Sequence, residues 1–442
     1  MLEANRNPNI EIISFSEVEK VEGYVGNYHV TVKRKPRYVI EDLCNGCGDC
    51  APVCPIHVPN YWQENIGARK CIDICFGQAI PFIYDIEKES CVECYACVDA
   101  CEPHAIDFSQ EPEYEELDVG TIIVATGWDL FAPKEYGYGE YANVINQIHL
   151  ERILAPNGPT TGHVKRPSDG KTPKEILFIN CVGSRDEERT FCSGVCCMIG
   201  LKNARLLKEE IPDAHITICY IDIRTNEKNF EEYYTKTREE GIDLIRGKVG
   251  EITEDSETKN LNVRVYSSLT DEIVRIDADL VVLSTAILPS KGTRHIADVL
   301  GIDYDTHGFL TEHHFGLSPQ ETKYLGVYIC GFAQGPKNIS YSVSQARAAA
   351  SKVAELTSKG EAELELICAV IDDENCISCK RCEKNCPKNA IIVPAEKIAE
   401  VDEINCDGCG ICATCCPTQA IQIRYYTDDQ IMNQMLALIK EE

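Results

Sequence analysis

The sequence predicts an α/β fold to which two small cysteine-rich modules are attached. Three observations support this prediction. β-Branched runs alternate with helical stretches through the middle of the chain, 26 of the 442 residues are cysteine, and most of these cysteines recur at one fixed spacing. A chain of this length allows about three domains. Its apolar fraction of 44% is enough to bury real cores, so a small disulfide-stapled fold is excluded.

Charge and hydropathy narrow the class of protein further. The formal net charge is −28 and no stripe of basic residues is present, which argues against nucleic acid as a partner. The first residues form no basic-then-apolar signal region, and no apolar run approaches the roughly 18 residues of a membrane span. We therefore expect a cytoplasmic protein without a transmembrane segment. Cysteines at this density in a reducing compartment point to metal binding.

The spacing Cys-x2-Cys-x2-Cys-x3-Cys occurs four times, as one pair of motifs near each end of the chain. In such a pair, three thiolates of one tight loop bind one cubane, while the fourth cysteine binds the neighbouring cluster. Zinc sites use Cys-x2-Cys pairs but rarely this pattern. The pattern therefore predicts four [4Fe-4S] clusters with these ligand sets: Cys44, Cys47, Cys50 and Cys101; Cys91, Cys94, Cys97 and Cys54; Cys376, Cys379, Cys382 and Cys416; Cys406, Cys409, Cys412 and Cys386.

Four further cysteines lie in the middle of the chain. Cys181 ends a predicted strand, and Cys192, Cys196 and Cys197 precede or begin a predicted amphipathic helix. A helix N-terminus favours anionic thiolates. Spacing alone leaves two interpretations open here: a fifth cluster, or three buried structural cysteines and a surface thiol. Cys71 and Cys75, at i and i+4, could form a metal pair, but two ligands alone do not hold a cluster. The remaining six are therefore interpreted as core or surface thiols without assigned chemistry: Cys71, Cys75, Cys219, Cys330, Cys368 and Cys415.

The strands and helices of the α/β part follow from the apolar pattern. After a strand-rich start over 9–39, β-branched and helical runs alternate in the manner of a parallel sheet, and a hairpin then returns to that sheet. A final strand joins an alanine-rich helix through a glycine-rich turn. The predicted elements are a strand within 118–131 that breaks at Gly127, strand 175–180, helix 196–210, strand 215–223, helix 229–240, strand 243–252, hairpin 261–285 and the strand–turn–helix segment 324–356.

No Gly-x-Gly-x-x-Gly motif occurs in the sequence. A dinucleotide-binding half-fold begins with a strand and that motif, because its glycines let the backbone approach the pyrophosphate. Either no nucleotide is bound, or another chain supplies the pyrophosphate loop. The glycine-rich turns at 125–127 and 330–335 fit flavin or phosphate contact and ordinary strand-to-helix turns equally well.

With these residues laid out, the chain resembles the family of A-type iron–sulfur subunits of heterodisulfide reductase. The resemblance covers nearly the whole chain, and its most specific stretch is CVGSRD…FCSGVCCMIGLK, beside CNGCGDCAPVCP, VGTIIVATGWDLFAP and YICGFAQGPKN. It implies a thioredoxin-reductase-like flavoprotein with an incomplete FAD domain. The implied domains are 1–40, 111–170 and 296–366 for the FAD domain, 41–110 for an inserted two-cluster ferredoxin domain, 171–295 for a Rossmann-like domain with an extra cluster, and 367–442 for a C-terminal two-cluster ferredoxin domain with a terminal helix.

The resemblance also implies cofactor contacts. Cys181, Cys192, Cys196 and Cys197 would hold a fifth [4Fe-4S] cluster, and Lys202 would lie by the flavin N5, where a cation stabilises reduced flavin. Without the resemblance, Lys202 is read as a solvated helix lysine. The family normally begins with a further domain that carries a glycine-rich FAD loop, so the chain is similar to the C-terminal part of a split protein, with FAD shared with a partner chain. The implied FAD contacts are Thr126, Gly127, Lys202, Gly331, Gln334, Gly335, Gln345 and Ala346.

The function implied is electron transfer in anaerobic, methanogenic metabolism. FAD would take two electrons from a hydrogenase or formate dehydrogenase module and send one toward a disulfide reductase and one toward ferredoxin, which is electron bifurcation. Disulfide reduction would occur on partner subunits of the B and C type. The partners would also include the N-terminal half of the split protein. Two alternatives remain: an electron wire without flavin chemistry, and a component of a quinone-linked relative in sulfur metabolism.

Overall fold

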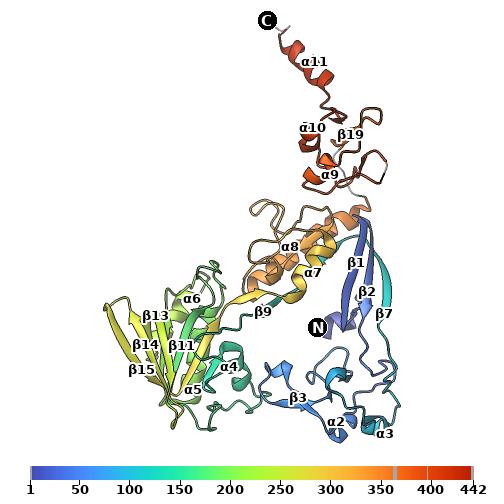
Figure 1. The fold of residues 1–442 in the computed structure, drawn as a ribbon. Helices are drawn as coiled ribbons and strands as arrows, with labels where there is room; N and C mark the ends of the chain where they lie inside the picture. The colour runs from blue at the N-terminus through green and yellow to red at the C-terminus, as the bar shows by residue number, and fades with distance from the viewer. Residues whose placement is uncertain (1, 362–365, 396, 440–442) are drawn as a thin grey trace.

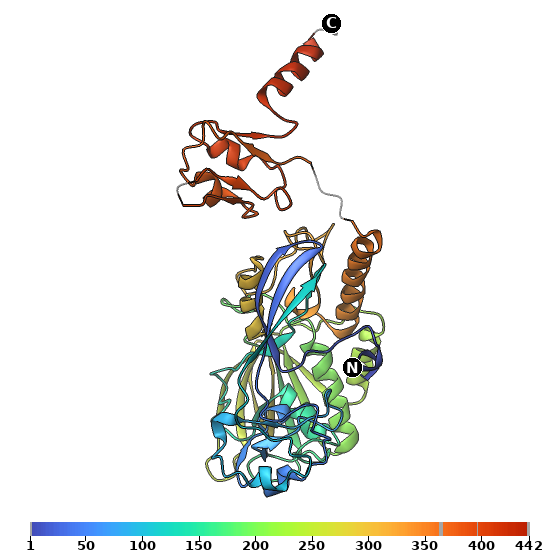
Figure 2. The same cartoon turned by 90° about the vertical axis from the view of Figure 1, so that its right-hand side faces the viewer.

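The computed structural model describes residues 2–361, 366–395 and 397–439 (Figure 1). It has an α/β body with a cysteine-rich module toward each end, as the sequence predicts. The two modules lie at opposite ends of the molecule in both views (Figures 1 and 2). No helix in the described ranges is long and apolar enough to cross a lipid bilayer.

The larger half of the body is a seven-stranded sheet with the order β10-β16-β11-β12-β13-β14-β15. The first five strands pair in parallel, and the last two continue antiparallel as a hairpin. The predicted run 272–285 divides into two strands, of which the second lies inside the sheet. The strands are β10 (Val144–Asn146), β11 (Glu175–Val182), β12 (His215–Tyr220), β13 (Asp243–Glu254), β14 (Leu261–Ser267), β15 (Glu272–Ala278) and β16 (Leu280–Thr285).

Three helices cover one face of this sheet: α4 (Gln147–Leu154), α5 (Cys196–Glu210) and α6 (Phe230–Glu239). α5 places apolar residues at helical spacing, and Leu201, Ala204 and Leu207 are fully buried against Phe178 of β11. The opposite face of the sheet has a core of its own, to which β11 contributes Leu177 and β14 contributes Val263. The packing of α5 along β11 fixes the N-terminus of this helix at the carboxyl edge of the parallel strands.

The smaller half of the body joins the beginning and the end of the chain. β1, β2 and β7 form an antiparallel sheet, and β8 pairs in parallel with β18 although about 200 residues separate them. A shared core includes Tyr28, Val124 and Ile329. The elements are α1 (Leu2–Arg6), β1 (Ser16–Tyr24), β2 (Asn27–Arg34), β7 (Glu113–Val119), β8 (Ile122–Val124), β9 (Trp128–Leu130), β17 (Ile287–Pro289), α7 (Lys291–Leu300), β18 (Val327–Ile329), the 3-10 turn η3 (Gly331–Ala333) and α8 (Ile339–Lys359).

The N-terminal module is inserted between β2 and β7. Its own small core contains cysteines together with aliphatic residues such as Val39, Ile72 and Ile86. The module consists of α2 (Cys50–Val53), β3 (His57–Pro59), η1 (Tyr61–Gln63), β4 (Ala68–Lys70), β5 (Ile72–Asp73), β6 (Asp85–Ile86), η2 (Lys88–Ser90) and α3 (Ala96–Ala100).

The C-terminal module follows α8 and projects from the body beside the ends of β1 and β2 (Figures 1 and 2). Its core is built in the same way, from cysteines and residues such as Ile391 and Ile421. The module consists of β19 (Ala369–Ile371), α9 (Arg381–Asn385), β20 (Ile391–Ile392), β21 (Glu400–Val401), α10 (Ile411–Cys415), β22 (Ile421–Ile423) and α11 (Asp428–Ile439). The domain boundaries expected from the sequence stay predictions.

Candidate metal centres and the adjoining cavity

Each cysteine module contains two small apolar pockets that are lined by thiols. Every pocket combines three cysteines of one motif with the fourth cysteine of its partner motif, so the structure brings together the crossed sets expected from the spacing. That these thiols bind clusters stays a prediction. We name each pocket by its first loop cysteine: the Cys44 pocket with Cys47, Cys50 and Cys101; the Cys91 pocket with Cys94, Cys97, Cys54 and also Cys71; the Cys376 pocket with Cys379, Cys382 and Cys416; and the Cys406 pocket with Cys409, Cys412 and Cys386.

The four motif loops share one backbone conformation. In each loop the third and fifth residues have positive φ, which bends the chain around the pocket. After the fourth cysteine of a motif, backbone N–H groups also point at sulfur: Ala105 N lies 3.3 Å from Cys101 Sγ, and Ala390 N lies 3.3 Å from Cys386 Sγ. Such contacts stabilise thiolates. The residues with positive φ are Gly46 and Gly48, Glu93 and Tyr95, Ser378 and Lys380, and Gly408 and Gly410.

The electrostatics of the pockets disfavour free thiolates. Burial, and then the neighbouring thiols, raise the pKa of Cys50 to about 12 and that of Cys412 to about 11. A cationic metal centre would reverse this shift because coordination deprotonates a thiol. Within the described residues, no three His, Cys, Asp or Glu side chains lie close enough together to hold one metal ion.

The four cysteines of the middle block converge at the N-terminus of α5. Cys181 is the last residue but one of β11 and has a φ of 62°, and Cys196 and Cys197 lie on the first turn of the helix. Burial, and then the charges of Cys197, Cys181 and Cys192, raise the pKa of Cys196 to about 12. Gly194 N lies 3.4 Å from Cys192 Sγ. Four sulfurs thus gather where the helix dipole favours negative charge.

A cavity of about 690 Å³ opens beside these four cysteines. Its volume falls within the range of small-molecule sites, about 300–1,000 Å³, and Trp128 and Phe332 give it aromatic walls. The N-terminus of α8 also faces it, through Asn338 and Ile339. Cys196 lines the cavity as well, so one side chain borders both the group of four thiols and this space. The volume and lining fit the ring system of a flavin.

The residues expected to contact FAD divide into two groups. Gly127 and Gly331 line the cavity. Gln334 and Gln345 are not lining residues but bond to the lining residues Gly331 and Lys337. Gln345 Oε1 accepts a hydrogen bond of 2.8 Å from Gly331 N, and Gln345 Nε2 donates to Gln334 Oε1 at 2.7 Å. Thr126 shares a 2.7 Å hydrogen bond with Thr293, while Gly335 and Ala346 are not lining residues. Their contacts with FAD stay predictions.

Two lysines lie near the cavity in different surroundings. Lys202 forms an ion pair with Glu151 of α4 and is not one of the residues that line the cavity. Lys337 does line it and donates hydrogen bonds to Gly331 O at 2.6 Å and Gln334 Oε1 at 2.8 Å. Burial lowers the pKa of Lys337 to about 8. Sequence reasoning missed Lys337, although its place between a glycine-rich turn and a helix N-terminus was a usable signal.

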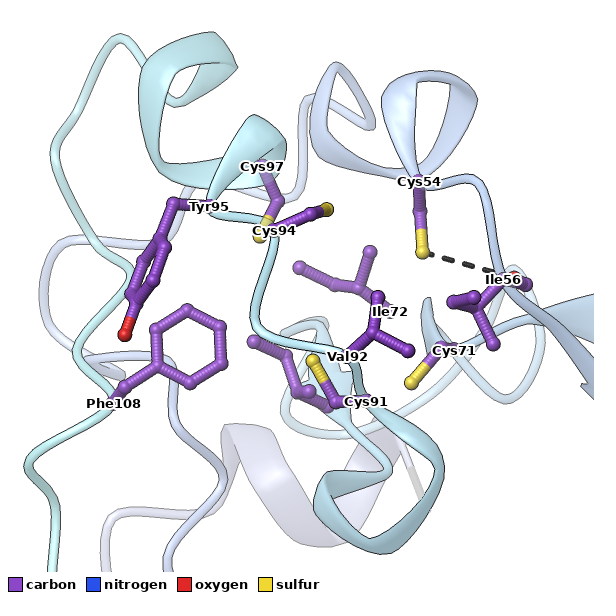
Figure 3. Close-up of a pocket in the computed structure, with 11 residues that line it drawn as sticks. Cys54, Ile56, Cys71, Ile72, Cys91, Val92, Cys94, Tyr95, Cys97 and Phe108 are labelled. Atoms are coloured by element: carbon purple, nitrogen blue, oxygen red, sulfur yellow. Dashed lines mark hydrogen bonds between the residues drawn. The ribbon is translucent and has the colours of Figure 1, made fainter.

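The six cysteines without assigned chemistry differ in their surroundings. Cys219 is buried inside β12, as expected of a small apolar residue, whereas Cys330 lines the cavity. Cys368 is buried at the edge of β19, and Cys75 and Cys415 are half-buried. Cys71 is buried and lines the Cys91 pocket, where Figure 3 shows its sulfur near those of Cys54 and Cys91.

Comparison with known families supports the iron–sulfur interpretation of both modules. A 4Fe-4S dicluster domain matches residues 369–423, and 4Fe-4S binding domains match residues 37–59 and 88–104. The protein is therefore an iron–sulfur protein in which ferredoxin-type modules are attached to an α/β body.

Comparison with curated proteins gives the family. The chain is 48% identical, over 98% of its length and 67% of the relative, to the A-type iron–sulfur subunit of CoB–CoM heterodisulfide reductase from Methanocaldococcus jannaschii. It is 49% identical, over 100% of its length and 68% of the relative, to an A-type iron–sulfur subunit of the same enzyme from Methanopyrus kandleri. The chain belongs to the family of heterodisulfide reductase A-type subunits, which are components of an oxidoreductase.

A solved structure shows only a distant likeness. Thioredoxin reductase of T. acidophilum matches 55% of this chain and 68% of its own, with 17% identity and a TM-score of 0.38.

Proposed function

We propose that this chain carries electrons between an FAD in the cavity and five [4Fe-4S] clusters, as part of a cytoplasmic heterodisulfide-reductase-type complex. Bound FAD can accept two electrons together and pass them on one at a time. One observation carries the proposal: Cys196 lines the cavity and also belongs to the middle group of four thiols. A cluster held by these thiols would border the flavin directly, which makes electron transfer between them short.

The chain's own residues would prepare the cavity for a flavin. Trp128 and Phe332 supply apolar walls, and Gly127 and Gly331 leave room for close approach of the ring. Lys337 places a buried ammonium at the same wall, where it would stabilise negative charge on a reduced ring. A partner chain would hold the pyrophosphate, because these 442 residues contain no Gly-x-Gly-x-x-Gly motif.

The positions of the two modules support two branches of electron flow. The N-terminal module contacts the body where Arg152 Nε of α4 donates to Gln63 Oε1 at 2.7 Å. The C-terminal module contacts it at the far end, where Lys388 Nζ donates to Lys323 O at 2.6 Å. Separate branches are what bifurcation requires, with one electron passing toward disulfide-reducing subunits of the B and C type and the other toward ferredoxin.

The names of two relatives suggest electron donors and acceptors. A relative in Methanococcus maripaludis is named as part of an H2/formate:CoB–CoM heterodisulfide,ferredoxin reductase, and one in Methanosarcina mazei as part of a ferredoxin:CoB–CoM heterodisulfide reductase. We assign a hydrogenase or formate dehydrogenase module as the donor here. The M. mazei name favours the second candidate function, in which the chain conducts electrons from ferredoxin without bifurcation.

Anaerobic purification of the complex, with iron and flavin counted together, tests the proposal. We expect about 20 iron atoms for this chain, four for each cubane, and about one FAD. About 20 iron atoms without flavin would support an electron wire instead. About 8 iron atoms and no flavin would contradict both functions.

A further inference from the structure

The Cys91 pocket differs from the other three motif pockets by one thiol. Each of those three is lined by four cysteines among the residues that the structure describes. The Cys91 pocket is lined by five, because Cys71 joins the predicted ligand set. The Cys44 pocket lies in the same module and shares Ile72 with the Cys91 pocket, but its other non-cysteine lining includes residues such as Val39 and Tyr84. In the C-terminal module Cys368 also lies close enough to Cys406 that burial, and then charges that include Cys406, raise its pKa, but Cys368 is not one of the residues that line the Cys406 pocket.

The backbone of Cys71 is held firmly in place. It lies between β4 and β5, its N–H donates to Ile56 O at 3.1 Å, and its carbonyl accepts from Glu87 N at 2.9 Å. Arg69, whose side chain is 4% exposed, pairs with the Glu87 carboxylate at 2.6 Å. Cys71 itself is 1% exposed. The thiol is thus positioned by surrounding structure and cannot swing to solvent.

The Cys71 sulfur faces the pocket between two predicted ligands. Figure 3 shows it beside the sulfurs of Cys91 and Cys54, which come from the loop before α3 and from the end of α2. Cys71 Sγ donates a hydrogen bond of 3.1 Å to the Glu87 carbonyl, and a thiol is only a weak donor. A thiol held by such a bond can change partner at little cost.

We propose that Cys71 is a reserve ligand, able to replace Cys91 on the cluster of this pocket. In the exchange, the Fe–S bond to Cys91 breaks and an Fe–S bond to Cys71 forms. The proton of the Cys71 thiol passes to the departing Cys91 sulfur, so no electron is gained or lost. The exchange keeps the cluster at four thiolate ligands. This inference rests on the proposed presence of a cluster in the pocket.

Single and double substitutions in the full chain, in its complex, test the proposal. The Cys91→Ala protein should keep about 20 iron atoms because Cys71 takes the free position, and Cys91→Ala with Cys71→Ala should keep about 16. Cys44→Ala is the matched control, since it removes the equivalent loop ligand from a four-thiol pocket and should also leave about 16. Cys71→Ala alone should keep about 20. Electron paramagnetic resonance of the reduced protein would follow the same cluster independently.

Two results would overturn the inference while leaving the proposed function intact. In the first, the wild-type protein has about 20 iron atoms while Cys91→Ala protein has about 16, the same loss as in Cys44→Ala.

The second result comes from exposing wild-type and Cys71→Ala protein to air, an experiment in which all predicted cluster ligands are left unchanged. Cys71→Ala protein should lose iron from this pocket several-fold faster than wild type, and equal rates would contradict the proposal. Wild-type protein without iron in the pocket would instead contradict the proposed function.

Discussion

At the scale of single residues, Lys337 is the charged side chain that most directly shapes the cavity. Burial lowers its pKa from 10.5 to about 8. Between about pH 8 and 10.5 the unfolded chain therefore binds a proton at this lysine that the folded chain does not. The contribution of this residue to stability consequently rises with pH across that window. At pH 7 the folded protein carries a buried ammonium at the cost of some stability.

We expect the Lys337→Met substitution to lower the reduction potential of the bound flavin at pH 7. Loss of about 1.4 kcal/mol of stabilisation of the reduced form corresponds to about 30 mV for a two-electron couple. Anaerobic redox titration of the flavin absorbance measures this shift, with iron content checked in parallel. The shift should shrink toward pH 9, where the wild-type lysine becomes neutral.

Lys202→Ala is the matched comparison, because the resemblance assigns that lysine to the flavin N5 while the structure pairs it with Glu151. A potential that changes only in Lys202→Ala would contradict the role of Lys337. A potential unchanged in Lys202→Ala would remove the role predicted for Lys202.

At the scale of elements, each motif loop contains two residues whose backbone is in the left-handed region. In the Cys406 loop these are Gly408 and Gly410, with φ of 61° and 78°. A Cβ on Gly408 would lie 2.5 Å from the Ile367 carbonyl oxygen, whereas one on Gly410 would meet Ile423 at 3.9 Å. The left-handed backbone favours glycine at both positions, but only at Gly408 is there also no room for a Cβ atom.

We expect Gly408→Ala to destabilise the C-terminal module more than Gly410→Ala. Left-handed backbone costs each variant about 1–2 kcal/mol, and the clash with backbone adds about 1–3 kcal/mol for Gly408→Ala alone. Thermal loss of iron–sulfur absorbance under anaerobic conditions measures the difference. Equal midpoints for the two variants would show that the loop moves away from Ile367 without cost.

At the scale of the whole molecule, Lys388 joins the C-terminal module to the body. Its ammonium donates to the Lys323 carbonyl and pairs with Asp407, each at 2.6 Å, and the side chain is only 13% exposed. Asn389 adds a longer contact of 3.4 Å to the Tyr324 hydroxyl. This small junction would set the distance that an electron travels between body and module.

Lys388→Ala should loosen the module. Because Lys388 also lines the Cys406 pocket, the iron content is counted in the same samples. Loss of the charged hydrogen bond is worth about 1.5–3 kcal/mol, so limited proteolysis should release the module at least several-fold faster. Lys384→Ala, an exposed lysine of the same module, is the control and should behave as wild type. Equal release from both variants would mean that the junction does not depend on Lys388.

The sequence alone determined the class of fold and the ferredoxin type of the two modules. Repeated cysteine spacing indicates ferredoxin-type modules because a tight loop can present its thiols in only a few ways. Alternating apolar runs predicted the strands and α5 because burial on one face imposes a period on the chain. These are local properties, readable over short segments.

Only the tertiary structure decided which distant residues share a site. Pairing of β8 with β18 brings Gly127 and Gly331 to one cavity, and the path of β4 and β5 brings Cys71 to a pocket whose motif it does not belong to. No spacing rule links residues so far apart. The sequence position of Lys337 could have indicated that it lies near the cavity, but only packing shows that it is buried. The sequence therefore determines which groups the chain carries, while packing determines their neighbours and, through desolvation, their charge.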